Sequence, residues 1–351
     1  MPNTKHLLKF AGKPVEDYHA GQSKIKPGSK VYRIRSEYRW GEVENTFLIN
    51  FQSFLKQRDV GKATALVIGG WDGATDGGLP TAAVEQLVGV RDRLPKLKAL
   101  FFGDITYQEY EISWLRQGDV SSLFSAYPNL EEIAFRGGIG LHLGKVQHKR
   151  LQKLTIQAGG LPANLFRQVL EADLPALTHL ELWLGRLDYG GNVTLEDLRP
   201  LLDGKCFTKM RSLGLRNRDR LAEIVVDVAK SPVVRRLDVL DLSMGSLNDE
   251  EAAPLLEIAA LKKLKTLDLS QNYLTASMIK QFKKAGIKIK ADDSRVAESY
   301  DDEEYRYSVI GEWRCSGWLA GILRAIALSI FSRQLQLLNF LLSTFFLTKN
   351  C

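Results

Sequence analysis

A short spacing of aliphatic residues recurs along this chain and constrains its fold more than any other feature. The segment LKKLKTLDLSQNYL places Leu264, Leu267, Leu269, Asn272 and Leu274 in the frame LxxLxLxxNxL. The LxxLxL part of the frame occurs eight times, starting at positions 63, 97, 130, 151, 177, 210, 237 and 264. Self-similarity at steps of 20 to 50 residues is the signature of a stacked repeat architecture.

Each frame predicts a short strand followed by a return segment. The last two aliphatic positions of a frame alternate, so they point to the same side of a strand. A single strand cannot bury that side, whereas strands stacked in parallel bury a continuous ladder of side chains. Helix start signals occur in four return segments, at Pro80-Thr81, at Thr194 with Asp197, at Asn248, and at Thr275. We therefore expect helices on the side that the leucines face.

This pattern resembles the leucine-rich-repeat superfamily, in its ribonuclease-inhibitor-like class. The resemblance implies an α/β solenoid, or horseshoe, with a parallel concave sheet, convex helices and a non-repeat N-terminal cap. A closer resemblance rests on GDITYQEYEISWL at 103–115, LPALTHLELWLG at 174–185 and DDEEYRYS at 301–308. It is to a bacterial family of cytoplasmic leucine-rich-repeat proteins without an established activity. It implies a fold and a compartment, and no chemistry.

The chain divides into three predicted regions. Residues 61–310 form the repeat solenoid, residues 1–60 form an N-terminal segment and cap, and residues 311–351 form a hydrophobic tail. A cap is expected because the first layer of a solenoid is apolar and would otherwise be exposed.

Both ends of the repeat region carry further structural signals. Val31 and Ile34 alternate with charged neighbours, which predicts an edge strand, and a phenylalanine-rich stretch that begins at Phe47 has helical spacing. At the other end, Ile287 and Ile289 have the spacing of one last short strand.

Three interpretations remain open for the tail at 311–351. Its apolar stretches, 319–331 and 335–347, are each shorter than the roughly 20 residues that a spanning helix needs. Arg324 and Arg333 would be costly at mid-bilayer and would lie on opposite faces of a helix. The tail is then a poorly packed addition, a helix docked on the last repeat or, least favoured, a membrane anchor.

The sequence contains no constellation typical of catalysis or metal binding. Its five histidines form no HExxH motif, and the three cysteines form neither a CxxC pair nor a disulfide framework. A glycine-rich stretch from Gly69 to Gly78 lies between a predicted strand and a predicted helix, where a phosphate cradle would sit. It lacks the Lys-Ser/Thr of a P-loop and does not fit GxGxxG. We predict a protein that is not an enzyme, with no catalytic residue, metal or cofactor.

The distribution of charge argues against a nucleic-acid partner. The formal net charge is +7, and the excess of basic residues lies near the two ends of the chain. A nucleic-acid binder usually concentrates its basic residues in a stripe, whereas Lys30, Arg33 and Arg39 alternate with Glu37 and Glu42. The beginning, MPNTKHLLKFAGKPVEDY, has no apolar secretory core, and the few cysteines suit a reducing compartment, so we expect the cytoplasm.

The remaining candidate for function is a surface. Residues between the leucines of each frame should face the concave side, where an aromatic side chain among arginines has the composition of a binding hot spot. The predicted contact residues there are Arg136, Lys153, Glu181, Trp183, Arg216 and Asp241. The alternative is an ordinary solvated sheet face, with Trp183 tucked under a loop.

A second predicted contact patch lies in loops that follow the strands. It consists of Asp104, Tyr107, Trp114 and Tyr189, and its alternative is that the aromatic side chains pack as a local loop core. The leading prediction is a non-enzymatic scaffold that binds an unidentified protein or peptide on the concave face. The alternatives are a nucleotide- or anion-binding protein, or an enzyme, that uses the stretch from Gly69 to Gly78, and an adaptor that is tethered to a membrane by its tail.

Overall fold

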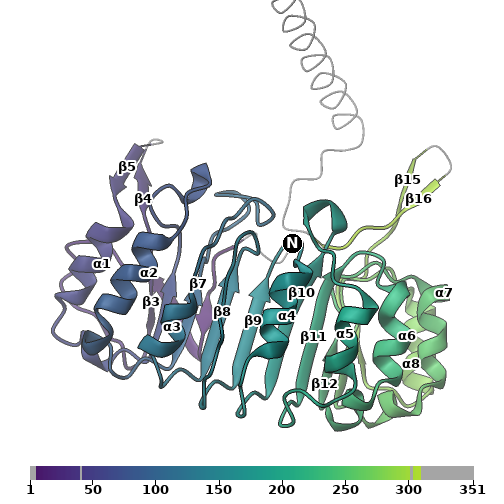
Figure 1. Cartoon of the computed structure of the whole chain (residues 1–351). Coiled ribbons are helices and arrows are strands. Elements are labelled where there is room, and N and C mark those ends of the chain that lie inside the picture. Colours follow the sequence, from purple (N-terminus) through teal and green to yellow (C-terminus); the bar gives the residue numbers. More distant parts are fainter. Residues whose placement is uncertain (1–4, 40–41, 301–302, 310–351) are drawn as a thin grey trace, which may run out of the picture. The chain divides into compact units, whose positions relative to one another are not determined.

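The computed structural model describes residues 5–39, 42–300 and 303–309. The predictions for the tail at 311–351 lie outside these residues. Within them, the main sheet has twelve strands in the order β1-β2-β3-β6-β7-β8-β9-β10-β11-β12-β13-β14 (Figure 1). The strands are β1 (Lys9–Phe10), β2 (Lys13–Asp17), β3 (Val31–Ile34), β6 (Ala65–Ile68), β7 (Ala99–Phe102), β8 (Glu132–Arg136), β9 (Lys153–Gln157), β10 (His179–Gly185), β11 (Ser212–Arg218), β12 (Val239–Asp241), β13 (Thr266–Asp268) and β14 (Ile289–Lys290).

All eight frames form strands, β6 to β13, and neighbouring strands pair in parallel. Their aliphatic positions match in register, so that Leu213 lies opposite Leu180 on one side and Leu240 on the other. The predicted α/β leucine-rich-repeat solenoid with a parallel sheet is therefore confirmed.

The helices cover one face of the sheet (Figure 1). They are α1 (Phe47–Leu55), α2 (Thr81–Gly89), α3 (Ser121–Ala126), α4 (Ala163–Glu171), α5 (Leu195–Leu202), α6 (Ala222–Lys230), α7 (Asp249–Ala252) and α8 (Ala276–Lys284). Thr194 and Asn248 both form capping boxes, and the Thr275 hydroxyl accepts the Met278 amide, as their positions in the sequence predict. The helix that begins after Asn248 is short, because Pro254 lies in a 3-10 helix that follows it.

The main core lies between the sheet and these helices. Leucines of the frames, such as Leu180, Leu213 and Leu240, are fully buried there against helix side chains such as Phe166 and Val225. Phe47, Phe51 and Phe54 of α1 extend the same core toward the N-terminal end. Burial of this apolar ladder is the main driving force for stacking the repeats.

Asn272 shows how the backbone hydrogen-bonding groups of the turn after a strand find partners inside this core. Its side chain is fully buried, donates to the carbonyls of Leu242 and Leu269 at 3.0 and 3.1 Å, and accepts the Leu247 amide at 3.0 Å. These bonds satisfy backbone groups of two successive repeats, as buried polar groups require.

The two ends of the sheet test the predictions made for them. The edge-strand prediction for Val31 and Ile34 is wrong, because β3 lies between β2 and β6 and pairs with both in parallel. Tyr32 lies opposite Leu66 and Ile34 lies opposite Ile68, so both continue the buried ladder by one strand. β3 is therefore a repeat strand without the leucine spacing. The last strand predicted around Ile289 is confirmed as β14.

Two small hairpins accompany the main sheet. One joins β4 (Glu37–Arg39) to β5 (Glu42–Asn45), and the other joins β15 (Glu298–Tyr300) to β16 (Glu303–Tyr305).

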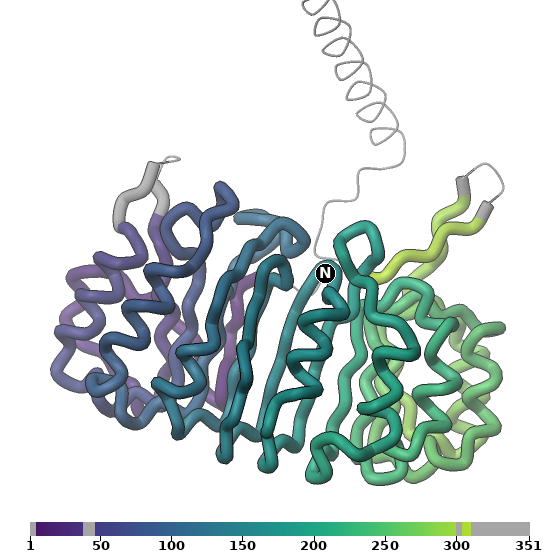
Figure 2. Tube along the Cα trace, in the orientation of Figure 1, coloured from purple at the N-terminus to yellow at the C-terminus, as the bar shows by residue number. Residues whose placement is uncertain are grey.

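The N-terminal segment crosses the face of the sheet that the helices leave free. Figure 2 shows this purple chain behind the strands, on the side away from the helices. Phe10 packs edge-on against Phe101 of β7, with ring centroids 5.9 Å apart. We call residues 5–10 the strap, and the face it crosses the helix-free face, which is the predicted concave face.

Candidate interaction surface

The helix-free face changes character between β8 and β9. Two rows of side chains, matched by strand register, run across it. The first row is Ala65, Ala99, Glu132, Lys153, His179, Ser212, Val239 and Thr266, and the second is Arg33, Val67, Phe101, Ala134, Thr155, Glu181, Gly214, Asp241 and Asp268. Apart from Arg33 and Glu132, the rows are apolar up to Ala134, and they are polar or charged almost throughout after it.

The strap covers the apolar part, which we call the covered half. Its residues are Val31, Ala65, Val67, Ala99, Phe101 and Ala134, and Phe10 is buried among them. Leu7 packs against the same cluster, while Leu8 points away and is 74% exposed. His6, Leu7 and Phe10 thus face the sheet, while Leu8 and Lys9 face solvent.

Asp104 fixes the strap at the far side of the covered half. Its carboxylate is fully buried and accepts the Leu7 amide at 3.1 Å, Arg33 Nη1 at 2.8 Å and Arg136 Nη1 at 3.2 Å. Burial alone would raise the pKa of Asp104, but the hydrogen bond from His6 and the charges of Arg136 and Arg33 lower it.

His6 adds a cation to this network. Its ring lies 3.5 Å from Asp104 Oδ2 and 3.3 Å from Glu109 Oε1. Burial would lower the pKa of His6, but the hydrogen bonds to Asp104 and Glu109 outweigh it and raise the pKa to about 9. His6 is therefore charged at neutral pH and draws the strap to the sheet.

This network contains two of the predicted contact residues, Asp104 and Arg136. Arg136 is 2% exposed, donates to Gln157 Oε1 and to the Ile105 carbonyl at 2.8 Å each, and lies over the Phe101 ring. Both side chains are thus buried inside the protein, and neither lies on the surface that a partner could reach.

The polar part of the face, from β9 to β13, is open, and we call it the open half. Its exposed or half-buried side chains are Lys153, Thr155, Gln157, His179, Glu181, Ser212, Arg216, Val239, Asp241 and Thr266.

Four predicted contact residues come together in the open half. Arg216 Nη1 donates to Glu181 Oε1 at 3.0 Å, and Arg216 Nε lies 3.4 Å from Asp241 Oδ2. The Trp183 indole donates to Glu181 Oε1 at 2.8 Å, and the Arg216 guanidinium lies over the Trp183 ring, 5.6 Å from its centroid. Trp183 itself is 2% exposed, in a cluster with Ile112, Met244 and Val309. The buried Trp183 therefore packs beneath the charged side chains of Arg216, Glu181 and Asp241, which are half-buried and reach the surface.

The two carboxylates of this cluster have opposite pKa shifts. Burial would raise the pKa of Glu181, but hydrogen bonds with His179 and Trp183 and the charge of Arg216 lower it to about 2. Burial raises the pKa of Asp241, and the charge of Arg216 only partly offsets it. The Arg216 guanidinium thus contacts two carboxylates, and it stabilises the charged form of Glu181 more than that of Asp241.

Lys153 lies at the border of the two halves, 52% exposed and 3.4 Å from Glu132 Oε2. A shallow hollow of about 330 Å³ begins at this border. Leu7, Phe10, Phe101 and Ala134 line one end of it, and Lys153, Thr155, His179, Glu181 and Arg216 line the other. The strap therefore forms a wall of the hollow.

The predicted loop residues do not form a common patch. Asp104 belongs to the buried network, Tyr107 is half-buried, and Trp114 is 60% exposed. Tyr189 is half-buried and packs under the Arg186 guanidinium, 5.6 Å from its ring centroid.

The glycine-rich stretch that follows β6 folds back on itself. The amides of Ala74, Asp76 and Gly78 donate to carbonyls within the stretch, and the buried Trp71 indole donates to the Gly78 carbonyl at 2.9 Å. Asp72 accepts the Phe47 amide, 2.8 Å away, at the start of α1. These amides are engaged, so the stretch offers no cradle for a phosphate at those positions.

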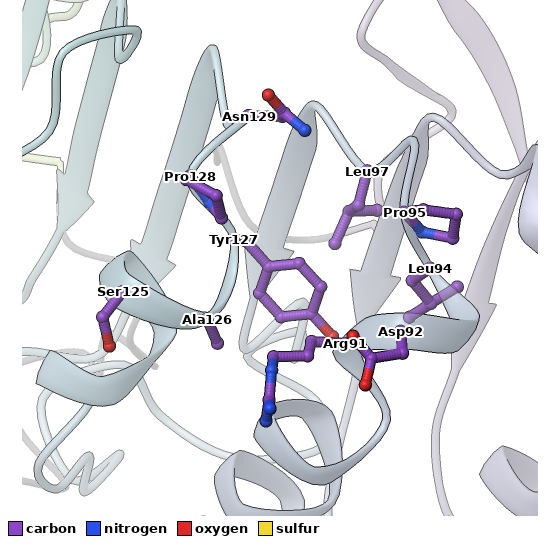
Figure 3. A pocket seen from close by; sticks show the side chains of 10 residues that line it. All are labelled: Arg91, Asp92, Leu94, Pro95, Leu97, Ser125, Ala126, Tyr127, Pro128 and Asn129. Carbon is purple, nitrogen blue, oxygen red and sulfur yellow. The ribbon is translucent and has the colours of Figure 1, made fainter.

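A second hollow, of about 400 Å³, lies where the chain enters β7 and β8 (Figure 3). Leu94, Pro95, Tyr127 and Pro128 contribute to its lining, and the Tyr127 hydroxyl already donates to the Leu87 carbonyl at 2.6 Å. It is a groove between successive turns, and its polar lining consists of Arg91, Asp92, Ser125, Tyr127 and Asn129. Among the residues that the model describes, no group of His, Cys, Asp and Glu could hold a metal ion, and no helix has the length and apolar character to cross a membrane.

The sequence reasoning missed the strap and the residues that hold it. His6, Leu7, Phe10 and Glu109 were not among the predicted site residues. A usable signal exists, because Ala65, Val67, Ala99 and Phe101 are apolar at positions predicted to face solvent. Apolar residues on the outer face of a predicted sheet indicate that another segment covers it.

Comparison with known proteins finds similar chains among solved structures. A protein from Bacteroides fragilis is 31% identical over 70% of this chain and 70% of its own, with a TM-score of 0.66. An internalin from Listeria monocytogenes is 16% identical over 67% of this chain and 55% of its own, with a TM-score of 0.33. The leucine-rich repeat domain of APL1B is 11% identical over 82% of this chain and 89% of its own, with a TM-score of 0.24. No family model and no curated protein matches the sequence.

Proposed function

The chain belongs to the leucine-rich-repeat superfamily and to the family of the Bacteroides fragilis protein, and from this premise we propose that it is a protein-binding scaffold. The binding surface is the open half of the helix-free face, from β9 to β13. A surface of this kind recognises partners through shape and charge and needs no catalytic group. The cytoplasm remains the proposed compartment.

One observation carries this proposal: charged side chains of opposite sign alternate across an accessible sheet face. Lys153, Glu181, Arg216 and Asp241 follow one another on β9, β10, β11 and β12. Neighbouring strands are about 4.8 Å apart, so β9 to β13 span about 19 Å. An extended segment of about six residues fits that length.

The hollow at the border supports the same interpretation. It is wide enough for one or two partner side chains, with an apolar end at Phe10 and a charged end at Arg216. The strap also shows that this sheet accepts an extended chain on its helix-free face, since Leu7 and Phe10 are seated there.

The test is site-specific photo-crosslinking in the cell of origin. A benzophenone amino acid replaces Thr155 in the middle of the open half, or Glu85 on the exposed side of α2 as a matched control. We expect a discrete crosslinked protein from position 155 that is absent from position 85. Identical products, or none, at both positions would contradict the proposal.

A second variant checks that the crosslink reports binding. Thr155→Arg places a bulky side chain in the hollow without removing a buried group, because Thr155 is half-exposed. Crosslinking from a benzophenone at the nearby His179 should then fall at least about fivefold, whereas Glu85→Arg should leave it unchanged.

A further inference from the structure

The covered half has the properties of a binding surface that already holds a ligand. The strap inserts His6, Leu7 and Phe10 toward the sheet and leaves Leu8 and Lys9 exposed. Recognition therefore uses three side chains and the Leu7 amide, which the Asp104 carboxylate accepts at 3.1 Å. Extended segments commonly bind protein surfaces through backbone bonds, which give affinity, and through a few inserted side chains, which give specificity.

The floor beneath the strap does not need the strap to balance its charges. The guanidiniums of Arg33 and Arg136 contact Asp104, and Arg35 contacts Glu109 at 3.0 Å. Asp17 completes the set, 2.6 Å from Arg33 Nε. Three carboxylates thus meet three guanidiniums, and the floor remains paired when His6 leaves.

The apolar floor also has a shape suited to an incoming side chain. Ala65, Ala99 and Ala134 are small, and they leave room above the sheet around Phe101. If the strap left, this apolar cluster would be exposed, and exposed apolar clusters are typical of interaction sites.

The strap is held by few bonds to the rest of the sheet. β1 pairs with β2 through Lys9 with Pro14 and Phe10 with Lys13, the Leu8 carbonyl accepts the Val15 amide at 3.0 Å, and the Leu7 carbonyl accepts Arg33 Nη1 at 3.2 Å. β2 also pairs in parallel with β3 through Val15, Glu16 and Asp17, so its other edge stays bonded to the sheet when the strap leaves. Release of the strap therefore leaves the repeat sheet intact.

We propose that the covered half is a second binding surface, for an extended peptide segment of a partner protein. The segment carries a cation, an aliphatic residue directly after it, and an aromatic residue three positions later. These are the chemical features of the strap. Asp104 and Glu109 bind the cation as they bind His6, the alanine floor receives the aliphatic residue as it receives Leu7, and Phe101 packs against the aromatic residue as it packs against Phe10. This surface is separate from the open half and does not depend on the function proposed for it.

Competition with the strap determines how such a segment binds. A tethered segment acts at an effective concentration on the order of millimolar, so it outcompetes a free peptide of equal chemistry. A partner gains access when the strap is released, and affinity should therefore rise when the strap is weakened.

The experiment uses the full chain with Leu7→Ser and Phe10→Ser, which removes both apolar anchors and keeps the segment in place. The probe is a fluorescent peptide of residues 5–12, KHLLKFAG, followed by fluorescence anisotropy. We expect it to bind the double variant at least about tenfold more tightly than the unmodified chain. A control peptide with serine at the positions of Leu7 and Phe10 should bind neither protein.

Two added substitutions locate the bound peptide. Val67→Lys, in the double-variant background, places a charge in the middle of the covered half and should abolish binding. Thr266→Arg in the same background alters the open half on its last strand, β13, outside the hollow that the strap lines, and should leave binding within about twofold, so that failure here and failure of the proposed function are distinguishable.

If the double variant does not fold, as judged by circular dichroism, the unmodified chain provides the measurement. Millimolar peptide should then accelerate hydrogen exchange of the strap, whose Leu7 amide is protected by Asp104. Equal binding of the two peptides, no binding by a folded double variant, or no change in exchange would overturn the proposal. Self-association of the double variant that excludes the peptide would also overturn it, in favour of an interface between copies.

Discussion

The two halves of the helix-free face are built on the same backbone and have opposite surfaces. Strands β6 to β13 continue in one parallel register, and their leucines form one ladder on the helix side. On the other side, an apolar cluster of alanine, valine and phenylalanine on β3 to β8 precedes Lys153, and mostly polar and charged residues follow it. The helix-side pattern thus determines the fold, while residues between the leucines determine whether the face binds its own chain or remains accessible.

The largest expected effect compares a buried carboxylate in the covered half with one in the open half. Asp104→Asn should reduce the free energy of unfolding by about 3 to 5 kcal/mol, because it leaves the buried Arg136 and Arg33 without their shared counter-charge. Asp241→Asn should change it by no more than about 0.5 kcal/mol, because burial already disfavours that charge and raises the pKa of Asp241. Urea denaturation measures both, and similar losses would remove the distinction between the halves.

The next effect concerns the two sides of the strap. Phe10→Ala should cost about 2 kcal/mol, since Phe10 is buried against Phe101, whereas Leu8→Ala should cost less than about 0.5 kcal/mol because Leu8 is 74% exposed. Thermal melts of the two variants check this. Equal shifts would show that the strap is not seated as described.

A smaller effect follows from the charge on His6. Its pKa rises to about 9 in the folded chain, so its stabilising contribution is complete below pH 6.5 and is lost as the pH rises through 9. Because His6 is only partly buried, solvent screens its ion pairs and reduces the effect of this pKa shift, so that between pH 7 and 10 the unmodified chain should lose about 1 kcal/mol more stability than His6→Gln. Melting temperatures across this range test the difference, and parallel curves for the two proteins would refute it.

The smallest effect lies at the border of the halves. Lys153 and Glu132 are 3.4 Å apart, and Lys153 is 52% exposed, so solvent screens the pair. A double-mutant cycle of Lys153→Ala and Glu132→Ala should yield a coupling below about 0.5 kcal/mol. A larger coupling would mean that the border is shielded from solvent as the covered half is.

Much of the fold was predictable because its determinants are local. The spacing of Leu264, Leu267 and Leu269 predicts a strand and its buried side, and Thr194 and Thr275 mark helix starts through bonds to residues three positions later. The strand at Val31–Ile34 was predicted, but its place inside the repeat sheet was not, because Tyr32 and Ile34 continue the ladder without leucines and only the pairing with β6 reveals it.

The candidate surface was only partly predictable, because its determinants are distant in sequence. Glu181, Arg216 and Asp241 could be grouped, since frame spacing gives strand register. Arg136 has the same position in its frame as Arg216 has, yet Arg136 is buried by contacts with Asp104 and Phe101. The strap itself is too short to show a period, and His6 lies 98 residues from Asp104.

The strap also has a mechanical consequence. It is bonded to β2 at one end and to Asp104, after β7, at the other, so it ties several strands together across their helix-free side. A stacked spring flexes by small rotations between neighbouring turns, and a brace across the turns resists those rotations. We therefore expect most of the elastic deformation beyond β8. The covered half keeps its shape, while the open half, from β9 to β13, adjusts its curvature to a bound partner.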